Sequence, residues 1–199
     1  MIDPKTIAYY DASVDDYIKM VSRETPDTDL QSFIDTVPKG GTVLDLGCGP
    51  GNSAAMMQTA GLIADATDAS AEMVRSARER FGVNATQARF DELDVVAKYD
   101  GIWANFSLLH APRSEMPANL QRIHTALKSG GYLHLGLKTG DGEKRDKLGR
   151  NYTYYQPDEL KALLIVANFK PNTDRSGCID ETMSMSGTHD PYMIVTAYA

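Results

Sequence analysis

Two kinds of apolar pattern alternate along most of the chain. Short apolar runs predict strands at residues 43–46, 62–67, 99–104 and 132–137, with a weaker run at 84–88. Elsewhere, apolar residues recur every three or four positions, which predicts helices at residues 54–61, 70–81, 114–128 and 157–167. Strands that alternate with helices in this way indicate a parallel sheet with helices on both faces.

The chain closes with two further strand-like runs, near residues 170–176 and 192–198. No helical pattern separates them, and a parallel pair needs a longer crossover, so we expect this pair to be antiparallel. The sequence therefore predicts an α/β fold with a doubly wound, seven-stranded, mostly parallel sheet and an antiparallel C-terminal strand. Open sheets of this kind bind ligands beyond the carboxyl ends of their strands, which directs attention to the residues after each strand.

Residues 1–41 are polar, with apolar positions spaced for helices at 7–21 and 30–37. We interpret this segment as an N-terminal helical cap on an α/β domain formed by residues 42–199. Residues 139–155 are charged, are punctuated by glycines and are too polar for the core. Their length and their place after the fifth strand predict a mobile substrate loop.

Composition and charge exclude several classes of protein. Lys and Arg number 20 and Asp and Glu 27, and the resulting net charge of −7 disfavours nucleic acid and anionic membranes as partners. No apolar run approaches the ~20 residues of a membrane span. Cys48 and Cys178 stand far apart, and no group of His, Cys, Asp and Glu has metal-ligand spacing. We therefore expect a cytoplasmic monomer or homodimer with reduced thiols and no metal.

The most informative segment is the glycine-rich turn after the first strand, Gly47-Cys48-Gly49-Pro50-Gly51. Glycines here let the backbone turn tightly and let a ligand approach the main chain. The spacing is G-x-G-x-G, whereas a dinucleotide-binding turn has G-x-G-x-x-G or alanine, and the completing position here is Asn52. No Gly-Lys-Ser/Thr follows, which excludes a P-loop.

The segment Val43–Gly51 resembles the first motif of the class I S-adenosylmethionine-dependent methyltransferases, and looser resemblance extends to Phe169. The resemblance implies a Rossmann-like methyltransferase fold that binds S-adenosyl-L-methionine. It also implies that the glycine loop contacts the methionine part and that Asp68 accepts hydrogen bonds from the ribose hydroxyls. The residues that it assigns to the cofactor are Tyr17, Asp45, Gly47, Cys48, Gly49, Gly51, Asp68, Ala69, Asp91 and Asn105.

Two of these carboxylates have a second interpretation. Asp68 is also placed to stabilise the N-terminus of the helix that Ser70 opens. Asp91 follows the weak third strand, where the resemblance implies a contact with the adenine amino group and Phe90 or Leu93 beside the ring. A solvated acidic turn, or Asp94 in the same role, fits that stretch as well.

The segment after the fourth strand, Asn105–His110, is expected at the reactive end of the site. It lacks the Asn/Asp-Pro-Pro-aromatic motif of enzymes that methylate nucleic-acid bases, which disfavours that activity. The imidazole of His110 suits proton removal at neutral pH. The alternative is a histidine that only packs at the start of the next helix.

Arg150 and Tyr152, in the predicted substrate loop, join His110 as candidate catalytic residues. An arginine beside tyrosines can hold a carboxylate or another anionic acceptor. The alternative is a solvated charged loop whose tyrosines pack on the following helix.

The function that these features favour is an S-adenosylmethionine-dependent methyltransferase acting on a small-molecule acceptor. One alternative is a regulator that binds the cofactor without catalysis. The other is an NAD-type Rossmann oxidoreductase, which the glycine spacing opposes.

Overall fold

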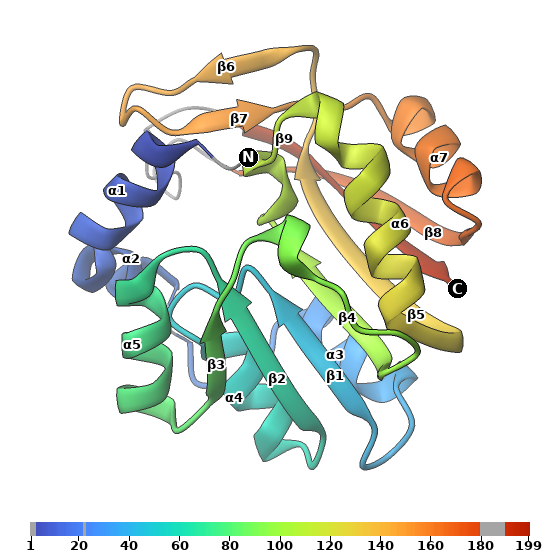
Figure 1. Cartoon of the computed structure of the whole chain (residues 1–199), viewed down its shortest axis with the longest axis horizontal. Coiled ribbons are helices and arrows are strands. Elements are labelled where there is room, and N and C mark those ends of the chain that lie inside the picture. The colour runs from blue at the N-terminus through green and yellow to red at the C-terminus, as the bar shows by residue number, and fades with distance from the viewer. Residues whose placement is uncertain (1–2, 22, 180–189) are drawn as a thin grey trace.

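The computed structural model describes residues 3–21, 23–179 and 190–199 (Figure 1). Its centre is a seven-stranded sheet with the order β3-β2-β1-β4-β5-β9-β8. The strands of this sheet are β1 (Thr42–Leu46), β2 (Ile63–Asp68), β3 (Asn84–Gln87), β4 (Tyr99–Asn105), β5 (Leu127–Lys138), β8 (Lys170–Ile179) and β9 (Asp190–Tyr198). The α-helices are α1 (Pro4–Ala12), α2 (Val14–Val21), α3 (Thr28–Thr36), α4 (Asn52–Thr59), α5 (Ala71–Phe81), α6 (Met116–Ala126) and α7 (Pro157–Val166).

The strand directions confirm the predicted α/β topology. Strands β1 to β5 pair in parallel, and β9 runs antiparallel to both β5 and β8. The strand order reverses between β1 and β4, which creates a crevice at the carboxyl ends of these two strands. The candidate site lies at this crevice.

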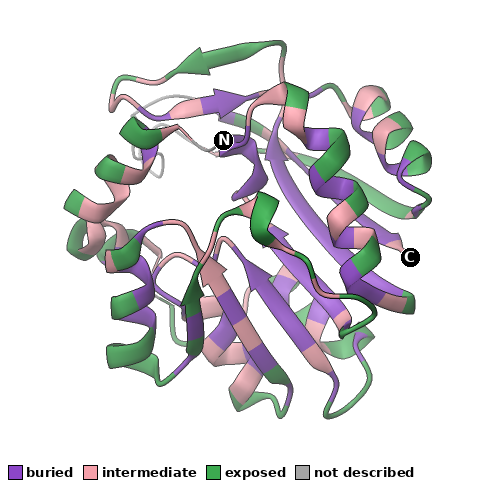
Figure 2. Ribbon diagram, viewed as in Figure 1, coloured by how far each residue is buried: buried purple, intermediate pink, exposed green. Residues whose placement is uncertain are grey.

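Alternate residues of the central strands face two separate cores, as the period of two in a strand requires. Leu44 and Ile102 point into a core that α6 and α7 cover. Val43 and Trp103 point into the opposite core, beneath α3, α4 and α5. The central strands are buried along most of their length (Figure 2), so they hold the residues that follow them on a rigid base.

The crossover between β3 and β4 departs from the alternating pattern. Residues 88–98, all of them described, contain the 3₁₀ turn η1 (Phe90–Glu92) and no α-helix. The face of β2 on this side is consequently open: the Ile63 side chain is 61% exposed, and Asp65 pairs with Lys98. The turn instead brings Phe90 toward the carboxyl end of the sheet.

The predicted loop 139–155 contains a two-stranded hairpin, β6 (Glu143–Arg145) and β7 (Asn151–Thr153). Helix α1 lies beside this hairpin on one side and near α5 on the other (Figure 1). Arg145 donates to both oxygens of Asp3, and the Asn151 amide donates to Oγ1 of Thr6. The N-terminal helix is thus tied across the crevice.

The helix expected over residues 7–21 is two helices, because Ser13 leaves the helical conformation and its N–H donates to the Tyr10 carbonyl. The bend lets Tyr10 and Tyr17 both face the crevice. The division into a cap of residues 1–41 and a domain of residues 42–199 stays an interpretation.

In the described part of the chain, no helix is long and apolar enough to cross a membrane. The same residues contain no cluster of three or more His, Cys, Asp or Glu side chains that suits a metal ion. Cys48 is buried and Cys178 exposed, and both are free thiols.

Candidate active site

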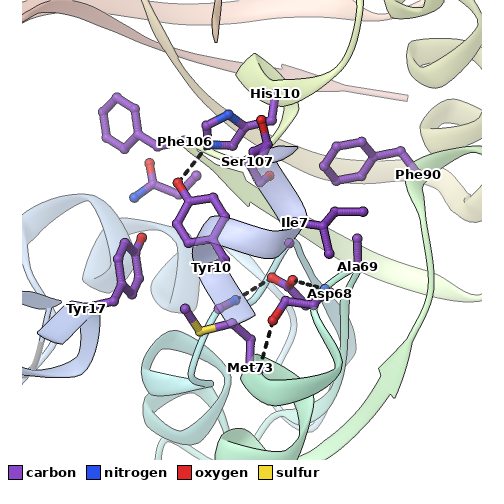
Figure 3. A pocket seen from close by; sticks show the side chains of 15 residues that line it. Ile7, Tyr10, Tyr17, Asp68, Ala69, Met73, Phe90, Phe106, Ser107 and His110 are labelled. Atoms are coloured by element: carbon purple, nitrogen blue, oxygen red, sulfur yellow. Dashed lines mark hydrogen bonds between the residues drawn. The ribbon is translucent and has the colours of Figure 1, made fainter. Parts of the chain in front are cut away.

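A cavity opens at the carboxyl ends of β1, β2 and β4, beneath α1 (Figure 3). Its space, including the open mouth, is about 590 Å³. Seven of the predicted site residues line it, namely Tyr17, Gly47, Gly49, Asp68, Ala69, Asn105 and His110. The remaining wall consists of Thr6, Ile7, Tyr10, Ser70, Met73, Phe90, Phe106 and Ser107.

All three glycines of the turn have a positive φ, but each is required at its position for a different structural reason. A Cβ at Gly47 would overlap Cβ of Ser107, and a Cβ at Gly51 would lie 2.7 Å from Cβ of Ala77. These two glycines are required by packing inside the protein. A Cβ at Gly49 would meet nothing nearer than a Tyr17 ring carbon at 3.4 Å, so its free side faces the cavity.

Asp68 accepts hydrogen bonds from two backbone amides. Its Oδ2 accepts from the Gly49 amide at 2.9 Å, and its Oδ1 accepts from the Ser70 amide at 2.9 Å. Burial raises the pKa of this carboxyl despite these bonds. The carboxyl therefore joins the glycine turn to the start of α5 and also lines the cavity.

Asp45, Cys48 and Gly51 lie behind the cavity wall. Oδ2 of Asp45 accepts from the Ala54 amide, and burial raises its pKa to about 7. Burial also raises the pKa of the Cys48 thiol well above its usual value. These residues shape the turn from within, because the lining of the cavity does not include them.

The structure does not bring Asp91 to the cavity. Its side chain is exposed, and its carboxylate pairs with Arg89. The neighbouring Phe90, one of the two apolar residues expected beside the adenine ring, does line the cavity. The 3₁₀ turn η1 explains the difference, because it directs adjacent side chains to different sides of the backbone.

Asn105, at the end of β4, is oriented from below by His134. Nε2 of His134 lies 3.1 Å from Oδ1 of Asn105, and an amide oxygen only accepts, so the imidazole is the donor. The His134 ring stacks on Trp103 with 3.7 Å between ring centroids. A Cβ at Gly136 would overlap the same amide oxygen, which explains the glycine at that position in β5.

The burial of His134 leads to a prediction about how the stability of the protein depends on pH. Burial lowers its pKa to about 3, so between pH 6.5 and 3 the unfolded chain binds a proton that the folded chain does not. Stability from this residue is therefore complete above pH 6.5 and is lost as the pH falls. Between pH 7.5 and pH 5, the free energy of unfolding of the wild type should fall by about 2 kcal/mol more than that of His134→Gln. Glutamine keeps a hydrogen-bond donor at this position but does not titrate. Urea unfolding at both pH values tests this, and parallel losses in the two proteins would contradict it.

His110 has a defined tautomer. Its Nδ1 lies 2.7 Å from the Asn151 carbonyl oxygen, which only accepts, so Nδ1 carries the proton. Its Nε2 lies 2.8 Å from the Tyr10 hydroxyl (Figure 3) and accepts a hydrogen bond from it. Burial lowers the pKa of His110 to about 4, so the imidazole is neutral at pH 7 with its Nε2 lone pair toward Tyr10.

Arg150 and Tyr152 pack behind Tyr10 and His110 and do not line the cavity. The Arg150 side chain is buried; its Nε and Nη2 donate to Asp146 at 2.9 and 2.7 Å, and its Nη1 lies 3.3 Å from the Tyr10 hydroxyl. The Tyr152 ring lies 4.7 Å from the His110 ring. The alternative of a solvated loop is therefore wrong for these two residues, whereas an anion-binding role for Arg150 stays a prediction.

Sequence reasoning missed part of the wall for identifiable reasons. Phe106 and Ser107 directly follow Asn105, so a search of the residues after each strand could have found them. Ile7 lies on α1, and no local pattern distinguishes it from the other apolar residues of that helix.

The strand order, the antiparallel β9 and the crevice beside the glycine turn define the class: a Rossmann-like methyltransferase fold. Residues 43–131 match the family model described as a methyltransferase domain. This match and the fold together support a class I S-adenosylmethionine-dependent methyltransferase.

Among its relatives is a trans-aconitate 2-methyltransferase from Variovorax paradoxus, 33% identical over 147 residues that cover 65% of this chain and 54% of the relative. A protein of the same name from Rhodopseudomonas palustris strain HaA2 is 32% identical over 157 residues, covering 74% of this chain and 58% of the relative. The chain thus spans little more than half the length of these relatives.

Solved structures share the fold. A 1,6-didemethyltoxoflavin-N1-methyltransferase from Burkholderia thailandensis has a TM-score of 0.72 at 23% identity, over 98% of this chain and 87% of its own. Phosphoethanolamine N-methyltransferase 2 from Haemonchus contortus has a TM-score of 0.74 at 13% identity, over 94% of this chain and 57% of its own.

Proposed function

We propose that this chain binds S-adenosyl-L-methionine in the cavity and transfers its methyl group to a small-molecule acceptor. The observation that carries the proposal is the pairing of Gly49 and Asp68. The open side of Gly49 is a cradle that any side chain would fill, and the half-buried Asp68 carboxyl lies beside it. A ligand that packs against backbone at one point and offers hydroxyl donors to a carboxylate at the next fits this arrangement.

The cavity wall divides naturally between the cofactor and the acceptor. Asp68 would hold the ribose, the Gly47–Gly49 turn the methionine part, and Met73 and Phe90 are the apolar side chains available to adenine. Asn105, Tyr10 and His110 then remain for the reacting end. Bound there, the cofactor supplies a methyl group on a sulfonium centre, which is already activated for in-line displacement.

The protein's own contribution is orientation, exclusion of water and a site for a proton. Helix α1 lies over the cavity, and its bonds to the hairpin and to α5 hold it there. Nε2 of His110 is the atom that would take a proton from an acceptor hydroxyl or amine. Tyr152 and Arg150 would hold Tyr10 and His110 in register from behind.

Titration of the protein with S-adenosylmethionine, S-adenosylhomocysteine and NADH tests the proposal against its alternatives. We expect S-adenosylmethionine and S-adenosylhomocysteine to bind and NADH not to bind. Release of S-adenosylhomocysteine with an acceptor present separates an enzyme from a regulator that only binds. A cytoplasmic location and a monomeric or homodimeric state stay predictions.

Asp68→Ala is expected to weaken cofactor binding by about 1–3 kcal/mol, the range for losing a charged hydrogen-bond acceptor from a buried site. Asp65→Ala is the matched control, because Asp65 lies on the same strand but pairs with Lys98 outside the cavity. Calorimetry on both variants measures the difference. Equal affinity in Asp68→Ala and wild type would leave Asp68 only its structural role at the start of α5.

A further inference from the structure

The Asn105 side chain is held in one orientation by β5. Its Oδ1 accepts from Nε2 of His134, and a Cβ at Gly136 would overlap the same oxygen. The amide group is planar and carries its oxygen and its nitrogen on separate arms. Because the oxygen arm is fixed against β5, the nitrogen arm points away from that strand, toward the cavity that Asn105 lines.

His134 suits this task because its own position is fixed. Its side chain is buried, and its ring stacks on Trp103 with an angle of 18° between the ring planes. Burial lowers the pKa of His134 to about 3, so at neutral pH the ring carries a single proton. The hydrogen bond to Asn105 places that proton on Nε2. His134 does not line the cavity, so it reaches a bound ligand only through its neighbours.

The nitrogen of the Asn105 amide is available to a ligand. Within residues 3–21, 23–179 and 190–199, Nδ2 makes no hydrogen bond, and it is not a buried atom. An amide nitrogen donates and does not accept. Nδ2 can therefore bind a carboxylate, carbonyl or hydroxyl oxygen, whereas it offers nothing to an ammonium group.

The register of the sheet places Asn105 beside the glycine turn. Strands β1 and β4 pair in parallel with Asp45 opposite Trp103, so Gly47 and Asn105 lie side by side two residues further on. The proposed function puts the methionine part of the cofactor at this turn, and that part carries a carboxylate and an ammonium. None of the described residues that line the cavity is Lys or Arg, so a protein hydrogen bond to this carboxylate comes from a neutral donor.

From the fixed amide and its place beside the turn, we infer that Nδ2 of Asn105 donates to the carboxylate of the cofactor. His134 is the positioning residue that keeps Asn105 a donor toward the cavity. This inference rests on the proposed function and specifies which charged group of the methionine part Asn105 binds. Asn105 then stands where the methionine part meets the reacting end of the site.

Asn105→Asp tests the contact with the smallest change of shape. The variant keeps an oxygen for His134 and replaces the N–H donor toward the cavity by a negatively charged oxygen. At pH 8, calorimetry should show S-adenosylhomocysteine binding at least about tenfold more weakly to the variant than to wild type, because two carboxylates would meet. Decarboxylated S-adenosylhomocysteine, which lacks only the carboxylate, should bind the variant at least as tightly as wild type.

Two results would overturn the contact. One is equal or tighter binding of S-adenosylhomocysteine by Asn105→Asp, which is expected if the amide nitrogen faced the ammonium. The other is an equal loss of affinity for both ligands, which would show that the carboxylate is not involved. Failure of S-adenosylhomocysteine to bind wild type would overturn the proposed function instead.

The positioning role of His134 has its own pair of variants. His134→Leu removes the donor and lets the Asn105 amide turn its oxygen toward the cavity, whereas His134→Gln keeps a donor. His134→Leu should lower the affinity for S-adenosylhomocysteine by about fivefold and leave that for the decarboxylated ligand unchanged. His134→Gln should restore the wild-type ratio of the two affinities. A purely structural role would weaken both ligands alike in His134→Leu, and that result would overturn the positioning role.

Discussion

Gly49→Val is expected to lower the affinity for S-adenosylmethionine by at least about 100-fold while leaving the protein folded. The added side chain would project into the cavity, because the nearest protein atom to a Cβ there is a Tyr17 ring carbon at 3.4 Å. Valine at Gly47 or Gly51 would be less informative, because it would first strike Ser107 or Ala77 inside the protein. Gly49 is therefore the glycine that reports on the ligand.

The control for Gly49→Val must carry the same backbone strain. Gly40→Val does so, since Gly40 has a φ of +70° and a Cβ there meets nothing within 4 Å. Both variants should lose about 1–2 kcal/mol of stability from the left-handed conformation. Calorimetric titration and urea unfolding on the pair separate the effects. Unchanged affinity in folded Gly49→Val would remove the cofactor from this turn.

His110→Ala is expected to lower kcat by about 10²–10⁴ while cofactor affinity stays close to wild type. The expected loss is that of a general base, because Nδ1–H bonded to the Asn151 carbonyl leaves Nε2 to accept a proton at the cavity wall. His124→Ala is the control, because His124 lies on α6 and packs against Phe169, away from the cavity. A loss below tenfold would reduce His110 to a packing residue.

The pH profile gives a second test of His110. A general base must be unprotonated to act. The pKa of His110 is about 4, so its imidazole stays unprotonated until the pH falls to about that value. Protonation of His110 should therefore lower kcat only as the pH falls through about 4. A fall centred near the ordinary histidine value of about 6.5 would contradict the buried, neutral state.

The sequence predicted the parts of the molecule that local patterns determine. Period-two and period-3.6 spacing located the strands and helices of the sheet, and the glycine turn with Asp68 located the crevice. The helix expected at 7–21 was wrong because a break at Ser13 leaves its apolar spacing almost unchanged.

What the sequence did not predict depends on contacts between distant segments. Tyr10 meets His110 across 100 positions, and Arg145 fixes Asp3 across 142. Phe90, expected beside the adenine ring, lines the cavity, whereas Asp91 does not, because hydrophobic periodicity does not fix the register of a short turn after a four-residue strand. The burial of Arg150 follows from Asp146 and three tyrosines that surround it only in the folded chain.

A crystal structure of the protein with S-adenosylhomocysteine tests the central claim most directly. The account predicts both ribose hydroxyls within hydrogen-bond distance of the Asp68 carboxylate, with the amino-acid part of the ligand against the Gly47–Gly49 backbone. It also predicts that the ligand sulfur faces the side on which Tyr10, Asn105 and His110 meet. Ligand density elsewhere on the protein, or a ligand in the cavity that makes no contact with Asp68, would contradict it.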